Sequence, residues 1–158
     1  MVKELDVAMQ HLSDVIFRTT GKDVSLHPGA GAAGGMGGSL HAFLDAQLKP
    51  GIELLLETLD FAEKIKDADL LITGEGKSDR QTLMGKVPSG ILQEARRQQI
   101  PVILLAGAIE DAEILNAAGF RGVFSITPSP VSLEQAMQPE FAQENIRRTV
   151  EQICRIFF

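Results

Sequence analysis

The residue types best suited to chemistry gather in segment 74–88, which reads Gly-Glu-Gly-Lys-Ser-Asp-Arg-Gln-Thr-Leu-Met-Gly-Lys-Val-Pro. The segment follows the apolar run 68–73, so two carboxylates, three cations and several glycines stand where a buried strand is expected to end. In open α/β sheets, ligand crevices form at the carboxyl ends of the strands. The segment therefore predicts a site for a phosphate or carboxylate group.

Phosphoryl transfer is the chemistry that these side chains would suit. Such a transfer to a hydroxyl requires a metal ion, cations and a positioned base. Glu75 and Asp79 could hold Mg²⁺, or one of them could accept the hydroxyl proton. Lys77, Arg80 and Lys86 could neutralise phosphates or bind a substrate carboxylate. The alternative is a solvated charged loop, which is what most charge clusters are, but the position after a buried strand favours a site.

Neither Gly-Lys pair of this segment completes a Walker A motif. The Gly-Lys-Ser at 76–78 would need a glycine five residues earlier, where Leu71 stands. The Gly-Lys at 85–86 has Arg80 at the corresponding place and is followed by Val87 instead of Ser or Thr. The segment is therefore not a P-loop.

A second glycine cluster, at 28–38, independently suggests an anion site. Gly29, Gly31 and Gly34 satisfy the G-x-G-x-x-G spacing of dinucleotide-binding folds, which also requires a strand before the turn and a helix after it. The preceding segment is short and polar, and Pro28 interrupts the turn. We therefore reject dinucleotide binding.

Two readings of the glycine cluster stay open. The glycines could let a loop and a helix pack closely, or their amides could cradle an anion before a helix over 39–48. His27 and His41 flank the cluster and are each read as hydrogen-bonded structural residues, and His11 is read as a helix-surface residue. The candidate anion-binding residues are Gly29, Gly31, Gly34 and Gly35.

Composition narrows the class of protein. The 158 residues are 44% hydrophobic and 23% charged, which suits one globular domain or parts of two. A net charge of −6 argues against a nucleic-acid surface, because phosphate backbones favour clustered Lys and Arg. The single cysteine, Cys154, cannot form an internal disulfide and fits a cytoplasmic location. The longest apolar run, 101–109, is too short to span a membrane.

Apolar runs alternate with helical patterns from residue 69 onward. Continuous apolar strands separated by helices indicate an α/β fold with a parallel sheet. Three strands are few for a doubly wound sheet, so this part resembles the second half of a domain. The expected strands cover 69–73, 101–106 and 122–127, and the expected helices cover 88–99, 111–118 and a short helix capped by Ser132.

Helical spacing also marks both ends of the chain. The first part is expected to form helices over 4–20 and 39–48, and a further helix over 53–65. The last helix is expected over 140–157, with its apolar side chains in the core. Those side chains are Phe141, Ile146, Val150, Ile153 and Phe157.

Three stretches of the chain resemble the type-1 glycerate kinase family, ATP-dependent enzymes that phosphorylate D-glycerate. They are Pro-Gly-Ala-Gly-Ala-Ala-Gly-Gly-Met at 28–36, the charged segment 68–81 with Gly-Lys-Val-Pro at 85–88, and Ile-Thr-Pro-Ser-Pro-Val-Ser-Leu-Glu-Gln-Ala at 126–136. The apolar run 101–107 matches in type and position. The resemblance covers essentially the whole chain, and its first two motifs are specific.

The resemblance implies a divided architecture, because members of that family are more than twice this length. Residues 67–158 would form the second half of a flavodoxin-like parallel sheet domain. Residues 1–66 would form the C-terminal part of an inserted α/β domain that carries the glycine-rich loop. The chain would then be the C-terminal portion of the enzyme, inactive by itself.

The resemblance also implies a function, with ATP and Mg²⁺ as cofactors and glycerate as the substrate. The glycine loop and the charged side chains would face a cleft between the domains, with Lys86 and the loop amides on phosphate. Asp79 is hypothesised to be the general base and Glu75 the metal ligand. Gln81, with Lys77 and Arg80, would contact phosphate or substrate.

A different class of function also stays open, namely a non-catalytic α/β module that binds a phosphorylated or carboxylate metabolite. In either case a truncated sheet would expose an edge and apolar faces, so self-association is expected. No nucleic-acid or membrane partner is expected.

Overall fold

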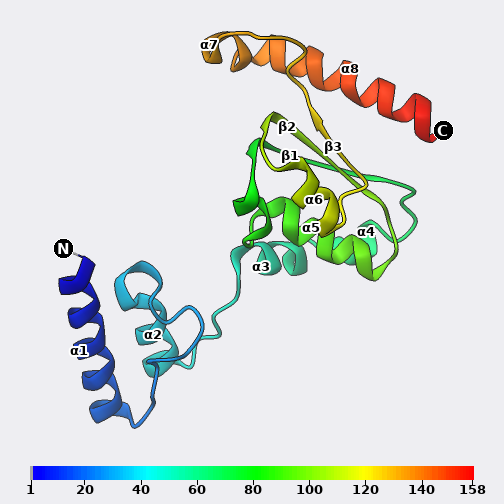
Figure 1. Cartoon of the computed structure of the whole chain (residues 1–158). Helices are drawn as coiled ribbons and strands as arrows, with labels where there is room; N and C mark the ends of the chain where they lie inside the picture. The colour runs from blue at the N-terminus through cyan, green and yellow to red at the C-terminus, as the bar shows by residue number, and fades with distance from the viewer. Residues whose placement is uncertain (1) are drawn as a thin grey trace. The chain divides into compact units, whose positions relative to one another are not determined.

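The computed structural model describes residues 2–158 and forms two compact units, Met1–Gly51 and Ile52–Phe158 (Figure 1). The first unit holds helices and the glycine-rich loop, and the second holds the sheet. Ile65 packs in the main core of the second unit. The expected domain boundary between 66 and 67 in the longer protein stays a prediction.

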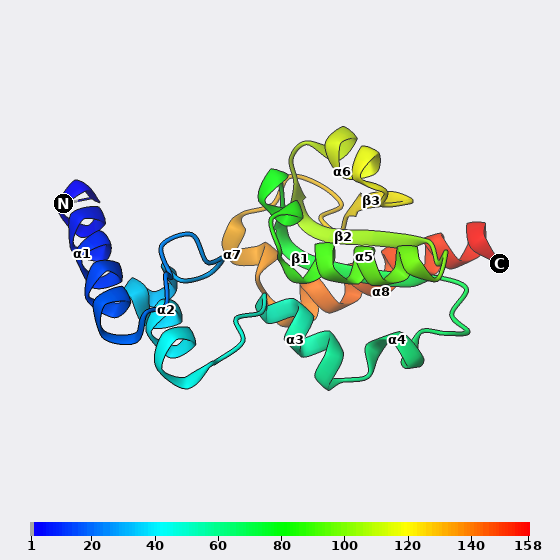
Figure 2. The same cartoon turned by 90° about the horizontal axis from the view of Figure 1, so that it is seen from below.

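The first unit is a pair of helices, α1 (Val2–Thr20) and α2 (Ala32–Leu44), which lie side by side (Figures 1 and 2). The expected helix over 4–20 is confirmed, because its apolar side chains recur at helical spacing and Ile16 is buried. The helix expected over 39–48 is displaced, since α2 starts inside the glycine cluster, is interrupted by left-handed residues at 33–35, and ends at Leu44. A left-handed Asp45 ends it by donating its amide hydrogen to the Leu40 carbonyl.

The sheet of the second unit has three parallel strands in the order β1–β2–β3. They are β1 (Leu71–Ser78), β2 (Val102–Ile109) and β3 (Gly122–Ser125). The register pairs Leu71 with Val102, and Ile103 with Gly122. The predicted α/β fold with parallel strands is thus confirmed.

Helices cover both faces of this sheet (Figures 1 and 2). On one face, α5 (Val87–Arg97) and α6 (Ala112–Ala118) pack against a core that includes the fully buried Leu104 and Leu115. On the other face, α8 (Pro139–Phe157) contributes Ile153, which packs with Ile103 and Leu105. Full burial of one such side chain stabilises a fold by about 1.5–3 kcal/mol, so the two aliphatic layers hold the sheet in place.

Several helix boundaries confirm the sequence signals for starts and stops. Gly119 ends α6 in the left-handed conformation, so the expected end of this helix at 118 is confirmed. The Ser132 hydroxyl caps α7 (Leu133–Ala136) by accepting the Gln135 amide hydrogen at 3.2 Å. The strands over 69–73 and 101–106 are also present, although both begin one or two residues later and extend further.

One predicted helix and one predicted core position are wrong. The helix expected over 53–65 is broken into α3 (Gly51–Thr58) and α4 (Phe61–Lys64), because Asp60 adopts a left-handed backbone with φ 48°. Ile146 of α8 is not in the core, since 43% of it is exposed.

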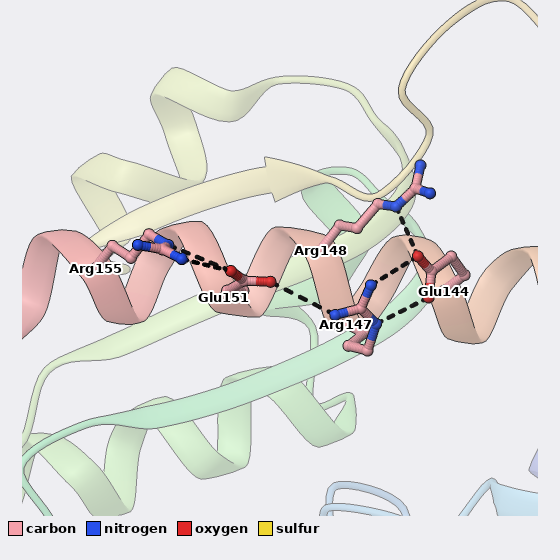
Figure 3. Close-up of polar contacts among 5 residues, drawn as sticks. All are labelled: Glu144, Arg147, Arg148, Glu151 and Arg155. Carbon is pink, nitrogen blue, oxygen red and sulfur yellow. Dashed lines mark hydrogen bonds and ion pairs between the residues drawn. The ribbon is translucent and has the colours of Figure 1, made fainter.

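The solvent face of α8 carries a ladder of ion pairs that runs from Glu144 to Arg155 (Figure 3). The Glu144 carboxylate accepts hydrogen bonds from Arg147 at 2.8 Å and from Arg148 at 2.7 Å. Arg147 lies 3.5 Å from Glu151, which pairs with Arg155 at 2.8 Å. The hydrogen bonds from Arg147 and Arg148 lower the pKa of Glu144 to about 2.

Candidate functional site

The charged segment predicted as a loop is in part a strand, because β1 continues through Ser78. Lys77 of β1 pairs with Ala108 of β2 in the parallel register. The two strands approach closely there, since a side chain at Gly107 would come within 2.9 Å of the Gly76 carbonyl oxygen. The prediction that the strand ends at 73 is therefore wrong, and Glu75 and Lys77 are held by sheet hydrogen bonds.

The Glu75 carboxylate is the centre of a small polar cluster. Its Oε1 atom accepts a hydrogen bond from the Ser78 hydroxyl at 3.0 Å and another from the Thr82 hydroxyl at 2.5 Å. Its Oε2 atom lies 4.0 Å from the Lys86 ammonium nitrogen. The Glu75 side chain is 14% exposed and that of Lys86 is 42% exposed, so solvent or a ligand can reach the pair.

The Asp79 carboxylate begins a short 3-10 helix, η1 (Arg80–Leu83). Its Oδ1 atom accepts the Gln81 amide hydrogen at 2.8 Å, while the Asp79 amide donates to the Thr82 hydroxyl at 3.1 Å. These contacts form a capping box that fixes the chain directly after β1. Gln81 itself is exposed. The Oδ1 atom of Asp79 thus caps the 3-10 helix, and Oδ2 takes no part in this hydrogen bond.

Two of the predicted phosphate-binding cations are paired within the second unit. Lys77 lies 2.8 Å from Glu110, which raises the pKa of Lys77 through a hydrogen bond and charge attraction. Arg80 donates to the Asp111 carboxylate at 3.1 Å. Both acidic residues follow the end of β2, so these pairs join the carboxyl ends of two neighbouring strands.

Sequence reasoning missed four residues of this region. Ser78 and Thr82 were overlooked because hydroxyl residues are common in turns, and Glu110 and Asp111 because they carry no motif. A signal did exist for the two acids, since carboxyl ends of adjacent parallel strands meet at one edge of a sheet. The cluster therefore joins residues from β1, η1, the N-cap position of α5 and the β2–α6 connection.

A pocket of about 370 Å³ has Glu75 in its lining. The remaining lining is apolar apart from Thr73, and it includes Ala106 of β2, Ile126 after β3 and Ile146 of α8. Glu75 is the one ionisable residue that the described part of the chain contributes to this wall. The partial exposure of Ile146 follows from its place in the pocket.

The glycine loop belongs to the first unit, and its glycines fall into two groups. Gly37 and Gly38 pack against the loop backbone, because a side chain at Gly37 would overlap the Gly29 carbonyl oxygen. Gly34 instead lies in open space with φ 68°, between the left-handed Ala33 and Gly35. A left-handed backbone at the non-glycine Ala33 is uncommon, and such strain is found at ligand-binding turns as well as at ordinary ones.

The other candidate glycines of the loop are also placed by the structure. Gly35 packs on α1, since a side chain there would overlap Leu12. Gly31 immediately precedes α2 and has only the Met9 methyl nearby, at 3.7 Å, and Gly29 has φ 84° beside Leu48.

The histidines beside the loop are hydrogen-bonded to backbone. Nδ1 of His27 lies 3.0 Å from the Pro28 carbonyl oxygen, and Nδ1 of His41 lies 3.0 Å from that of Ala46. Their rings stack with centroids 4.0 Å apart. His11 is exposed on α1. The hydrogen bonds of His27 and His41 agree with the structural roles expected of them, and the exposure of His11 agrees with its expected place on a helix surface.

The polar cluster fits a magnesium ion that also has phosphate ligands. Among residues 2–158, no three His, Cys, Asp or Glu side chains gather closely enough to hold a metal alone. Mg²⁺ commonly uses one or two carboxylates and completes its shell with water and substrate phosphates. The Oε2 atom of Glu75 is suited to that mode, because both hydroxyl bonds go to Oε1.

The fold and this cluster define an α/β protein with charged side chains at the carboxyl edge of a parallel sheet. A model of the glycerate kinase family matches residues 1–158. The chain is 42% identical to a glycerate kinase of Bacillus cereus and 42% identical to a glycerate 2-kinase of Escherichia coli. These matches cover 99% and 98% of the chain. The chain therefore belongs to the glycerate kinase family.

A solved structure supports the same assignment. The crystal structure of a protein described as glycerate kinase 2, from Salmonella typhimurium, superposes with a TM-score of 0.73 at 41% identity. It is matched over 98% of this chain but only 39% of its own length. The chain likewise spans 41% and 40% of the two curated relatives, about two fifths of each. Within residues 2–158, no helix has the length and apolar character needed to cross a bilayer.

Proposed function

We propose that this chain is the C-terminal portion of an ATP-dependent kinase that phosphorylates D-glycerate. The observation that carries the proposal is the Glu75–Lys86 pair, a carboxylate and an ammonium 4.0 Å apart beside the end of a parallel strand. Family membership over the whole chain supports the substrate class. The coverage of about two fifths of each relative supports the view that other residues complete the enzyme.

The roles proposed for the cluster follow from its chemistry. ATP supplies the phosphoryl group, and Mg²⁺ neutralises charge on its phosphates. Glu75 would hold the metal through Oε2, and the Lys86 ammonium would bind phosphate oxygens. Asp79 would accept the proton of the glycerate hydroxyl through Oδ2, since Oδ1 caps η1.

Further anion-binding roles are proposed for residues that the resemblance implicated. Lys77, Arg80 and Gln81 are exposed beside the cluster, and the first two would exchange their carboxylate partners for phosphate or substrate oxygens. In the first unit, the glycine loop would bind an anion through backbone amides at Gly29, Gly31, Gly34 and Gly35. Gly34 is the best suited of the four because its surroundings are open.

Location, domain division and self-association of the chain are also proposed. The chain would act in the cytoplasm, as its single cysteine suggests. Residues 1–66 and 67–158 would belong to different domains of the longer enzyme. The chain alone would self-associate through exposed apolar residues of the second unit, such as Phe124 and Ile156.

A coupled ADP-release assay tests the proposed function. It would be run with D-glycerate and Mg-ATP on this chain and on the longest reading frame that contains it. We expect glycerate-dependent ADP release from the longer protein and none from the chain alone. Absence of release from both, combined with calorimetric binding of phosphoglycerate to the chain, would favour the non-catalytic metabolite-binding module instead.

A further inference from the structure

We propose that Thr82, assisted by Ser78, is a positioning residue that fixes the Glu75 carboxylate and leaves one defined oxygen for the ligand. This inference rests on the proposed function, because it explains how Glu75 is oriented for phosphoryl transfer. Neither Thr82 nor Ser78 is among the candidate site residues that the sequence indicates.

Burial shows that the two hydroxyls belong to the interior and not to a solvated turn. Ser78 and Thr82 are both 0% exposed, although they flank a strongly charged segment. A buried hydroxyl loses its water partners and must find partners in the protein. Both hydroxyls donate to the same Glu75 oxygen, at 3.0 Å and 2.5 Å.

The Thr82 hydroxyl is held in one orientation by its two partners. It accepts the Asp79 amide hydrogen at 3.1 Å, so its own hydrogen is directed to Glu75. The same hydroxyl thus links the carboxylate on β1 to the turn that presents Asp79. Loss of this hydroxyl would release the Glu75 side chain and leave a backbone donor without its partner.

The two Glu75 oxygens have different hydrogen-bond partners, and this difference points to a ligand. A carboxylate oxygen without a short hydrogen bond inside the protein keeps its acceptor capacity for another partner. Here Oε1 receives both hydroxyls, whereas within residues 2–158 Oε2 has only the more distant Lys86 ammonium, at 4.0 Å. Oε2 is therefore the atom that a metal ion or a substrate hydroxyl would meet.

The main test is the kinetics of Thr82→Val and Thr82→Ser in the full reading frame. Valine keeps the shape but removes the hydroxyl, and we expect kcat to fall about 30-fold with KM for D-glycerate changed less than about threefold. Serine keeps the hydroxyl and should restore kcat to within about threefold of the wild type. Thr127→Val is the matched control, because its hydroxyl binds the Gly107 carbonyl oxygen and not Glu75.

A double-mutant cycle separates positioning from general stability. If Thr82 acts through Glu75, Thr82→Val should change kcat less than about twofold in a Glu75→Gln background. Equal losses in both backgrounds, or no loss in the wild-type background, would overturn the proposal. If Thr82→Val does not fold, Ser78→Ala replaces it, with a smaller loss in the same direction.

The failure of the proposed function would be recognised separately. A wild-type protein without glycerate-dependent turnover would refute the kinase assignment and, with it, the functional part of this inference. A cycle of Thr82→Val with Glu75→Ala, which removes the accepting oxygen, measured by urea unfolding of this chain, would then decide whether Thr82 fixes Glu75 at all. Coupling of at least about fivefold in the unfolding equilibrium constant supports that contact, and additive effects contradict it.

Discussion

The two glycine-rich segments of the chain look alike in sequence but are built in different ways. The loop at 28–38 contains no charged side chain, and glycines such as Gly37 allow backbone to touch backbone. The segment 74–88 is mostly strand and 3-10 helix, and its charged side chains are tied to each other and to the end of β2. Glycine content alone therefore does not distinguish a segment that acts through its backbone from one that acts through its side chains.

The two segments differ in which part of the residue matters. In the first segment, the absence of a side chain matters, so substitutions should act mainly on stability. In the second segment, specific carboxylate, ammonium and hydroxyl groups matter, so substitutions that keep the shape should act mainly on turnover. The following variants test that contrast, in order of decreasing effect.

Asp79→Asn should have the largest effect on turnover. The asparagine Oδ1 can still accept the Gln81 amide hydrogen, so the cap on η1 is kept while the proposed base is lost. Loss of a general base costs about 10²–10⁴-fold in rate. Steady-state kinetics of the full reading frame would measure this, with circular dichroism as the folding control. A change in kcat of less than a few fold would show that Asp79 is only a cap.

Gly37→Ala should have the largest effect on stability. The new methyl group would overlap the Gly29 carbonyl oxygen, and overpacking of this kind costs about 1–3 kcal/mol or more. Urea unfolding of the chain would measure the loss. Gly31→Ala is the matched control in the same loop, because its φ is −74° and only the Met9 methyl is near. Equal stability of both variants would contradict the packing role.

Ile156→Lys should weaken the expected self-association of this chain. Ile156 is 84% exposed at the end of α8, beside a pocket of about 390 Å³ that also includes Phe124. A charge there would have to be desolvated in any apolar contact between copies. Sizing chromatography at micromolar concentration would show a smaller species than the wild type, while Gln143→Lys on another part of α8 should not. A wild-type chain that is already monomeric would contradict the expectation.

Glu144→Gln should have the smallest effect, a change in the pH dependence of stability. The pKa of Glu144 is lowered from about 4.5 to about 2, so its contribution to stability is complete above pH 4.5 and is lost as the pH falls towards 2. The difference in urea midpoint between wild type and variant should therefore stay constant above about pH 4.5 and shrink between about pH 4.5 and pH 2. Glu140→Gln, outside the ion-pair ladder of Figure 3, serves as the control. A pH-independent difference would contradict the assigned pKa.

The fold was predictable where local signals and global packing agree. Gly119 and Ser132 gave correct boundaries because a C-terminal glycine and a capping serine act within one turn. The second half of β1 was missed because glycines are depleted in strands, yet pairing with β2 over seven residue pairs outweighs that preference. Asp60 broke a predicted helix without any proline or glycine to announce it.

The candidate site was predictable in part. The charged residues of 74–88 were found because charge after a buried strand is unusual, and Glu75 and Lys86 do lie together. Ser78 and Thr82 could not be found, since a hydroxyl is informative only when its burial and partner are known. The pairing of Lys77 with Glu110 depends on strand order, which one sequence does not determine.

The central claim is that the Glu75–Lys86 cluster is the chemical site of a glycerate kinase. Its most direct test is glycerate-dependent ADP release by the full reading frame, measured side by side for the wild type and Glu75→Gln. We predict release that requires D-glycerate and Mg²⁺, and a loss of at least about 100-fold in kcat/KM for the variant with its fold intact. Activity of Glu75→Gln within about threefold of the wild type would contradict the account.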